Sequence, residues 1–146
     1  FGAIRCSRLA IPHMKTTGGG RIINITTVGG KAPEGGSVPT SVSRAAGIAL
    51  TKAMSKEYAP DNILVNTICI GLIKSGQHDR LADEARSKEP DLTRDRFYAK
   101  WGKSVPLGRI GEAKEPGDLI AFLASDRAAY ITGASVNIDG GMSAVV

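Results

Sequence analysis

The sequence predicts an α/β protein built around a parallel sheet. Three short apolar segments have the composition of strands, at residues 21–26 (RIINIT), 63–70 (ILVNTICI) and 134–139 (ASVNID). The first two are apolar at most positions rather than alternating, which is typical of parallel strands covered on both faces. Helical patterns lie before and between them, at residues 3–15, 40–59 and 115–126. This alternating order implies right-handed crossovers between parallel strands.

Turn residues separate these elements. The sequence TTGGG follows the first helix, and Gly29 and Gly30 follow the first strand. Each strand also contains one asparagine, at Asn24, Asn66 and Asn137. Because a buried amide must be hydrogen-bonded, we interpret these side chains as ties at strand ends rather than as catalytic groups.

Residues 74–104 differ from the rest of the chain. Nearly half of them are charged, and two weak helical patterns lie around residues 81–88 and 95–101. One interpretation is an exposed helical excursion. The other is a mobile lid, because the segment follows the carboxyl end of a strand, where ligands bind in open α/β sheets. Both interpretations stay open at this point.

Composition limits the classes of function. The 146 residues fit one domain, residues 1–146, and the net charge is +5. Lysine and arginine are scattered among acidic neighbours, so we expect no nucleic-acid partner. No apolar run approaches the roughly 20 residues of a membrane helix, and we expect no signal peptide.

The cysteines and histidines show no metal-ligand spacing. Cys6 and Cys69 lie inside apolar segments, and His13 and His78 are isolated, so we expect no metal site. We interpret both cysteines as buried free thiols, which is typical of a cytoplasmic protein.

Three stretches together resemble the short-chain dehydrogenases/reductases. Residues 20–30 (GRIINITTVGG) resemble the family's strand with the active-site serine, and residues 63–76 (ILVNTICIGLIKSG) resemble its strand and loop at the nicotinamide. Residues 105–141 (VPLGRIGEAKEPGDLIAFLASDRAAYITGASVNIDGG) resemble its C-terminal signature. The resemblance implies a Rossmann sheet that binds NAD or NADP and transfers a hydride to or from a small-molecule carbonyl or alcohol.

The resemblance also implies roles for particular positions. The family's serine, which polarises the substrate oxygen, falls on Thr27. Its tyrosine, the general acid/base, falls on Thr40, and the lysine four residues later falls on Arg44. An asparagine that completes the proton relay would lie before Phe1. The nicotinamide-binding loop falls on residues that include Ile70, Gly71, Ile73 and Ser75.

The substitution at Thr40 matters most for activity. An aliphatic hydroxyl is a far weaker acid than a phenol, whose pKa is about 10, so it cannot shuttle a proton near neutral pH. Thr27 keeps a hydroxyl and Arg44 keeps a cation, although guanidinium is a poor copy of lysine. Tyr98, in the charged segment, is one alternative source of a phenol. We therefore expect weak activity or none from this chain alone.

The resemblance covers only the later half of a doubly wound domain. No G-x-G-x-x-G or Walker-type glycine loop occurs in the sequence, so we expect the N-terminal mononucleotide half to be missing and NAD binding to be weak. The family also implies a homo-oligomer formed through the first two helices. Two other classes stay open: a non-catalytic dimerisation or binding module, and a non-redox enzyme that uses Thr27 and Arg44.

Overall fold

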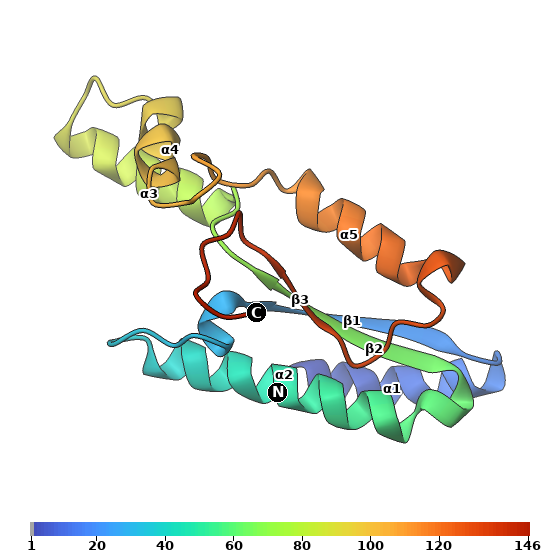
Figure 1. Cartoon of the computed structure of the whole chain (residues 1–146). Helices are drawn as coiled ribbons and strands as arrows, with labels where there is room; N and C mark the ends of the chain where they lie inside the picture. Colours follow the sequence, from blue (N-terminus) through green and yellow to red (C-terminus); the bar gives the residue numbers. More distant parts are fainter. Residues whose placement is uncertain (1) are drawn as a thin grey trace.

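A three-stranded parallel sheet lies between helices on both of its faces (Figure 1). The structure is a computed structural model that describes residues 2–146. The strands are β1 (Gly20–Thr27), β2 (Ile63–Ile70) and β3 (Ser135–Ile138), in the order β1-β2-β3. The helices are α1 (Gly2–Thr16), α2 (Val38–Glu57), α3 (Gly76–Lys88), α4 (Arg94–Gly102) and α5 (Lys114–Ala124). Short 3-10 turns are η1 (Val28–Gly30), η2 (Ala59–Asp61) and η3 (Asp126–Ala128).

The two faces of the sheet follow the period of two that strands impose on side chains. Ile22 and Val65 point to the face that α1 and α2 cover, where they pack with Met54. Ile23 and Ile68 point to the opposite face and pack in a cluster that contains residues of α5. Burial on both faces explains why the strands lack polar alternation.

The parallel sheet predicted from the sequence is confirmed, and all six predicted elements agree with the observed ones within two residues. The crossovers differ from expectation. The chain moves from β1 to β2 through α2 on one face, and onward to β3 through α5 on the other. Both connections lead to the next strand in the same direction along the sheet, but they cross its opposite faces. Two such connections have opposite handedness, so they cannot both be right-handed.

The charged segment folds as two helices beyond the carboxyl ends of the strands (Figure 1). Capping starts both helices: Ser75 accepts a hydrogen bond from the His78 backbone N–H, and Thr93 accepts one from that of Arg96. The two helices share a small hydrophobic cluster that includes Phe97. The segment is therefore an ordered helical pair, and a lid movement stays a prediction.

All three asparagine side chains are hydrogen-bonded, as predicted, but Asn24 and Asn66 lie in the middle of β1 and β2 rather than at strand ends. Asn24 donates to the Thr51 hydroxyl at 2.9 Å, Asn66 donates to the Ile131 carbonyl at 2.8 Å, and Asn137 donates to the Val145 carbonyl at 2.9 Å.

The expectation of two buried thiols is only half right. Cys69 is buried in β2, whereas Cys6 is exposed. Cys6 lies on the outer side of α1, and this helix buries only one of its faces.

Candidate functional site

The candidate site lies where β1 and β2 end. Thr27, the last residue of β1, is the register partner of Ile70, the last residue of β2. The position of the family's serine and the start of its nicotinamide-binding loop are therefore neighbours on adjacent parallel strands. This is the sheet edge at which ligands bind in open α/β proteins.

The turn η1 connects Thr27 to α2 and packs closely against it. A methyl group on Gly30 would lie 2.9 Å from the backbone carbon of Arg44. A methyl group on Gly29 would lie 3.4 Å from the Thr27 hydroxyl and 3.8 Å from that of Ser41. The turn therefore needs glycine at Gly30, and the hydroxyls of Thr27 and Ser41 both lie beside Gly29.

Sequence reasoning missed Ser41. Its side chain is only 6% exposed, and its hydroxyl is 2.7 Å from that of Ser37. A serine beside Thr40 in a helix gave no signal in the sequence, because its burial depends on the packing of η1.

Thr40 and Arg44 lie one turn apart on α2 and are both exposed. Within residues 2–146, no hydrogen bond joins the Thr40 hydroxyl to Thr27, and Arg44 forms no ion pair. The Arg44 side chain lines a groove beside β1. The structure thus places both residues on the helix that adjoins η1, as the resemblance implies, without direct contact between their functional groups.

The loop after β2 is held at three points. Gly71 touches β3's end so closely that a methyl group there would lie 2.7 Å from the Asp139 Cα. Ile73 forms a parallel bridge with Gly111, in which Gly111 donates to the Leu72 carbonyl at 2.9 Å. Ser75 caps α3. Three predicted cofactor positions, Gly71, Ile73 and Ser75, therefore lie in one anchored loop, and the fourth, Ile70, is the last residue of β2.

This loop suits the nicotinamide end of a dinucleotide. Among residues 2–146, the backbone N–H groups of Leu72 and Ile73 donate to no protein acceptor, so they are free for a polar ligand group. The same part of the chain contains no glycine-rich loop of the dinucleotide-binding type that would hold a pyrophosphate. The described residues thus fit one end of NAD(P), not the whole cofactor.

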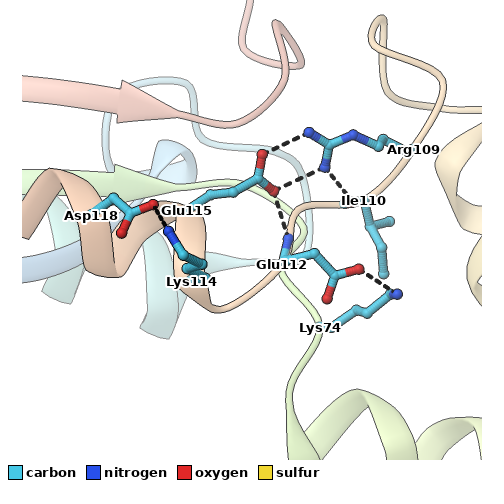
Figure 2. A network of polar contacts seen from close by, with 7 residues as sticks. All are labelled: Lys74, Arg109, Ile110, Glu112, Lys114, Glu115 and Asp118. Carbon is cyan, nitrogen blue, oxygen red and sulfur yellow. Dashed lines mark hydrogen bonds and ion pairs between the residues drawn. The ribbon is translucent and has the colours of Figure 1, made fainter.

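Charged side chains connect the loop after β2 to the start of α5 (Figure 2). Lys74 pairs with Glu112 at 2.5 Å, and Arg109 pairs with Glu115 through both of its terminal nitrogens, at 2.6 and 2.9 Å. The Arg109 guanidinium and the Glu112 backbone N–H lower the pKa of Glu115 to about 2. Sequence reasoning missed this network, since Lys74 and Glu112 are 38 residues apart.

Tyr98 is not a free phenol. Its side chain is only 7% exposed, and its hydroxyl donates to the Asp79 carboxylate at 2.5 Å. Burial and this hydrogen bond raise the pKa of Tyr98 to about 12. A phenol that is protonated, buried and already bonded to a carboxylate is a poor substitute for the missing tyrosine.

Lys31 also makes contacts that the sequence did not predict. It follows η1, and its ammonium donates to the Ser135 carbonyl and to the Asn137 side-chain oxygen, both at 2.7 Å. The segment between Thr27 and Thr40 is therefore anchored to β3.

The described part of the chain shows neither a metal-ligand cluster nor a helix that could span a membrane. No group of three or more histidine, cysteine, aspartate or glutamate side chains is arranged to hold a metal ion. Among residues 2–146, no helix has the length and apolar character required to cross a bilayer.

Known proteins resemble the chain along almost all of its length. A family model described as Enoyl-(Acyl carrier protein) reductase matches residues 1–143. An uncharacterized short-chain type dehydrogenase/reductase of Sinorhizobium fredii is 35% identical over 144 residues, which are 97% of this chain and 52% of the relative. The 3-oxoacyl-acyl-carrier-protein reductase FabG of Thermotoga maritima is 34% identical over 97% of this chain and 52% of its own length.

Solved structures show the same resemblance as the sequence comparisons. The L-sorbose reductase of Gluconobacter frateurii, in complex with NADPH and L-sorbose, superposes with a TM-score of 0.91 at 29% identity, over 99% of this chain and 55% of that one. An NADPH-bound short chain oxidoreductase of Pseudomonas aeruginosa PAO1 with an atypical catalytic center gives 0.83 at 32% identity, over 96% and 52%. The chain spans about half the length of the curated relatives it matches. It belongs to the short-chain dehydrogenase/reductase family.

Proposed function

We propose that this chain supplies the nicotinamide-facing half of an NAD(P)-dependent oxidoreductase that acts on a carbonyl or alcohol. The single observation that carries this function is the register pairing of Thr27 with Ile70, which brings the substrate-polarising position beside the nicotinamide loop. NADPH in the two solved relatives favours NADP over NAD as the cofactor. When bound, the nicotinamide ring supplies the hydride acceptor or donor.

The chain's own residues have limited roles in this proposal. Thr27 donates its hydroxyl to the substrate oxygen, and the loop from Ile70 to Ser75 holds the carboxamide through its free backbone N–H groups. Arg44 supplies positive charge near the ribose. Thr40 cannot transfer a proton at neutral pH, so we propose little or no turnover by this chain alone.

The test restores the family's catalytic pair. We expect the wild-type chain to oxidise no NADPH in the presence of L-sorbose, the ligand of the Gluconobacter relative. The double variant Thr40→Tyr, Arg44→Lys is assayed with the part of the Thermotoga reductase that this chain does not match, supplied as a separate polypeptide. Activity should then appear.

A matched variant separates the two positions. Arg44→Lys alone should stay inactive, because the phenol is still absent. If the double variant is inert although sedimentation shows that the two polypeptides are bound, the roles assigned to Thr40 and Arg44 are wrong.

The second candidate function is a non-catalytic dimerisation module. Its supporting observation is the apolar outer face of α1 and α2, where Leu9 is 74% exposed, Val38 67% and Val42 64%. An adjoining groove of about 390 Å³ lies between the two helices and includes Met54. Exposed apolar surface often marks a contact with a partner protein.

We propose a homo-oligomer through this face. Sedimentation velocity should show a dimer or a larger assembly for the wild-type chain, and a monomer for Leu9→Lys combined with Val42→Lys. A wild-type monomer at high protein concentration would contradict this proposal.

A further inference from the structure

The loop after β2 is paired with the segment before α5 along one of its two edges. Ile73 and Gly111 form a parallel bridge, in which the Gly111 N–H donates to the Leu72 carbonyl and the Lys74 N–H donates to the Gly111 carbonyl, both at 2.9 Å. In such a bridge the N–H and C=O of the central residue point to the opposite side. Ile73 therefore presents its own N–H and C=O on the edge that faces away from Gly111.

The side chain of His78 lies at this second edge. Its Nδ1 atom is 2.8 Å from the Ile73 carbonyl oxygen. Because a carbonyl oxygen only accepts, Nδ1 carries the hydrogen and donates it. Two elements hold the imidazole ring in place: Ser75 caps the first turn of α3, which contains His78, and Trp101 of α4 meets the ring in a T-shaped contact at 5.2 Å between centroids.

This contact changes what the edge offers to a ligand. An extended residue whose two backbone groups are both free offers one donor and one acceptor, which together match an amide. At Ile73 the histidine already donates to the carbonyl, whereas the N–H donates to no protein acceptor among residues 2–146. The edge therefore favours a ligand group that binds through an acceptor oxygen.

We infer that His78 is a specificity-determining residue, which selects the group that the loop accepts on a pyridine ring. Because it binds the Ile73 carbonyl, a carboxamide binds through its oxygen alone, and a carboxylate in the same position binds at least as well. The inference rests on the proposed function, in which this loop holds the carboxamide of the nicotinamide. His78 acts here through the Ile73 backbone and transfers no proton itself.

Two ligands that differ only in this group provide the test. They are nicotinamide mononucleotide and nicotinic acid mononucleotide, in which a carboxylate replaces the carboxamide. The 146-residue chain, labelled with nitrogen-15, is titrated with each ligand at millimolar and higher concentrations, and the NMR shift of the Ile73 amide gives the two Kd values. For the wild type we expect nicotinic acid mononucleotide to bind as tightly as nicotinamide mononucleotide, or more tightly.

His78→Leu should reverse this selectivity. The variant frees the Ile73 carbonyl, which repels a carboxylate oxygen and accepts a hydrogen bond from a carboxamide NH₂ group. The ratio of the two Kd values should then shift towards the carboxamide by about fivefold or more, the effect of one hydrogen bond.

Two further variants are the controls. In His78→Asn the side-chain amide nitrogen takes about the position of Nδ1 and can donate in the same way, so the wild-type ratio should return. Asparagine and leucine are both uncharged, so charge cannot explain a difference between these two variants. Gln77→Leu changes an exposed neighbour in the same turn of α3 and should leave the ratio unchanged.

The outcomes separate this inference from the proposed function. If His78→Leu weakens both ligands equally, or neither, the residue has a structural role at most and the inference is wrong, while the proposed function stands. A wild type that clearly prefers the carboxamide would also overturn the inference. If neither ligand shifts the Ile73 amide of the wild type, the nicotinamide loop of the proposed function is wrong, and the inference fails with it.

Discussion

Replacing Gly71 with alanine tests the geometry of the nicotinamide loop. Gly71 directly follows β2, and a Cβ atom at this position would lie 2.7 Å from both the Cα and the Cβ of Asp139. It would also lie 3.2 Å from the Asp139 carbonyl oxygen. Backbone atoms cannot rotate away as a flexible side chain can, so β2 and β3 must separate at their carboxyl ends.

The expected cost follows from this overpacking. Inserting a methyl group into a closely packed contact typically costs about 1–3 kcal/mol. Gly71 has no positive φ, so alanine fits its backbone conformation and the penalty is steric only. With a urea m-value of about 2 kcal/mol per molar, the unfolding midpoint should fall by about 1 M.

Gly76→Ala is the matched control, assayed by the same urea unfolding followed by circular dichroism. Gly76 is the first residue of α3, and no atom lies within 4 Å of a Cβ built there. Alanine favours helix, so the control should be neutral or more stable by up to about 1 kcal/mol. Equal midpoints for Gly71→Ala and the wild type would refute the close contact between β2 and β3.

Three further predictions concern stability and pH. Arg109 lowers the pKa of Glu115 to about 2. The wild type should therefore be more stable than Glu115→Gln by its full margin above about pH 4.5, and this margin should disappear as the pH falls towards 2. A difference in unfolding free energy that stays constant in acid titrations would contradict this. Because the pKa of Tyr98 is raised to about 12 by burial and Asp79, its ionisation should destabilise the fold between about pH 10 and 12; Tyr98→Phe, compared by thermal unfolding, should lose that pH dependence. Leu123→Ala should cost about 2–5 kcal/mol in urea unfolding, because this side chain is only 2% exposed in the cluster under α5; a loss below 1 kcal/mol would contradict its place in the core.

The layout of the sheet could be predicted because it depends on local pattern. Apolar runs such as residues 63–70 agree with β2 at both ends, and glycine turns mark where helices stop. The start of α3 was harder to predict. The helical pattern in the sequence begins near Leu81, whereas the helix begins at Gly76. Residues between those two positions are polar, so only the Ser75 cap indicates the true start.

Contacts between distant segments could not be predicted from the sequence. Lys31 and Asn137 are 106 residues apart, and nothing near Lys31 distinguishes it from a surface lysine. The hand of each crossover likewise depends on which face a helix covers, and the amphipathic pattern of α5 does not encode that choice. The positions of Thr27, Thr40 and Arg44 in the site came from the family resemblance, and their predicted roles are tested by the variants above.

Calorimetric titration of the isolated 146-residue chain with NADPH tests the central claim most directly. The loop after β2 offers backbone N–H groups to a nicotinamide, but the sequence contains no glycine-rich cradle for the pyrophosphate. We expect no saturable heat up to millimolar NADPH. Saturable binding with one site per chain and a Kd in the micromolar range would contradict it.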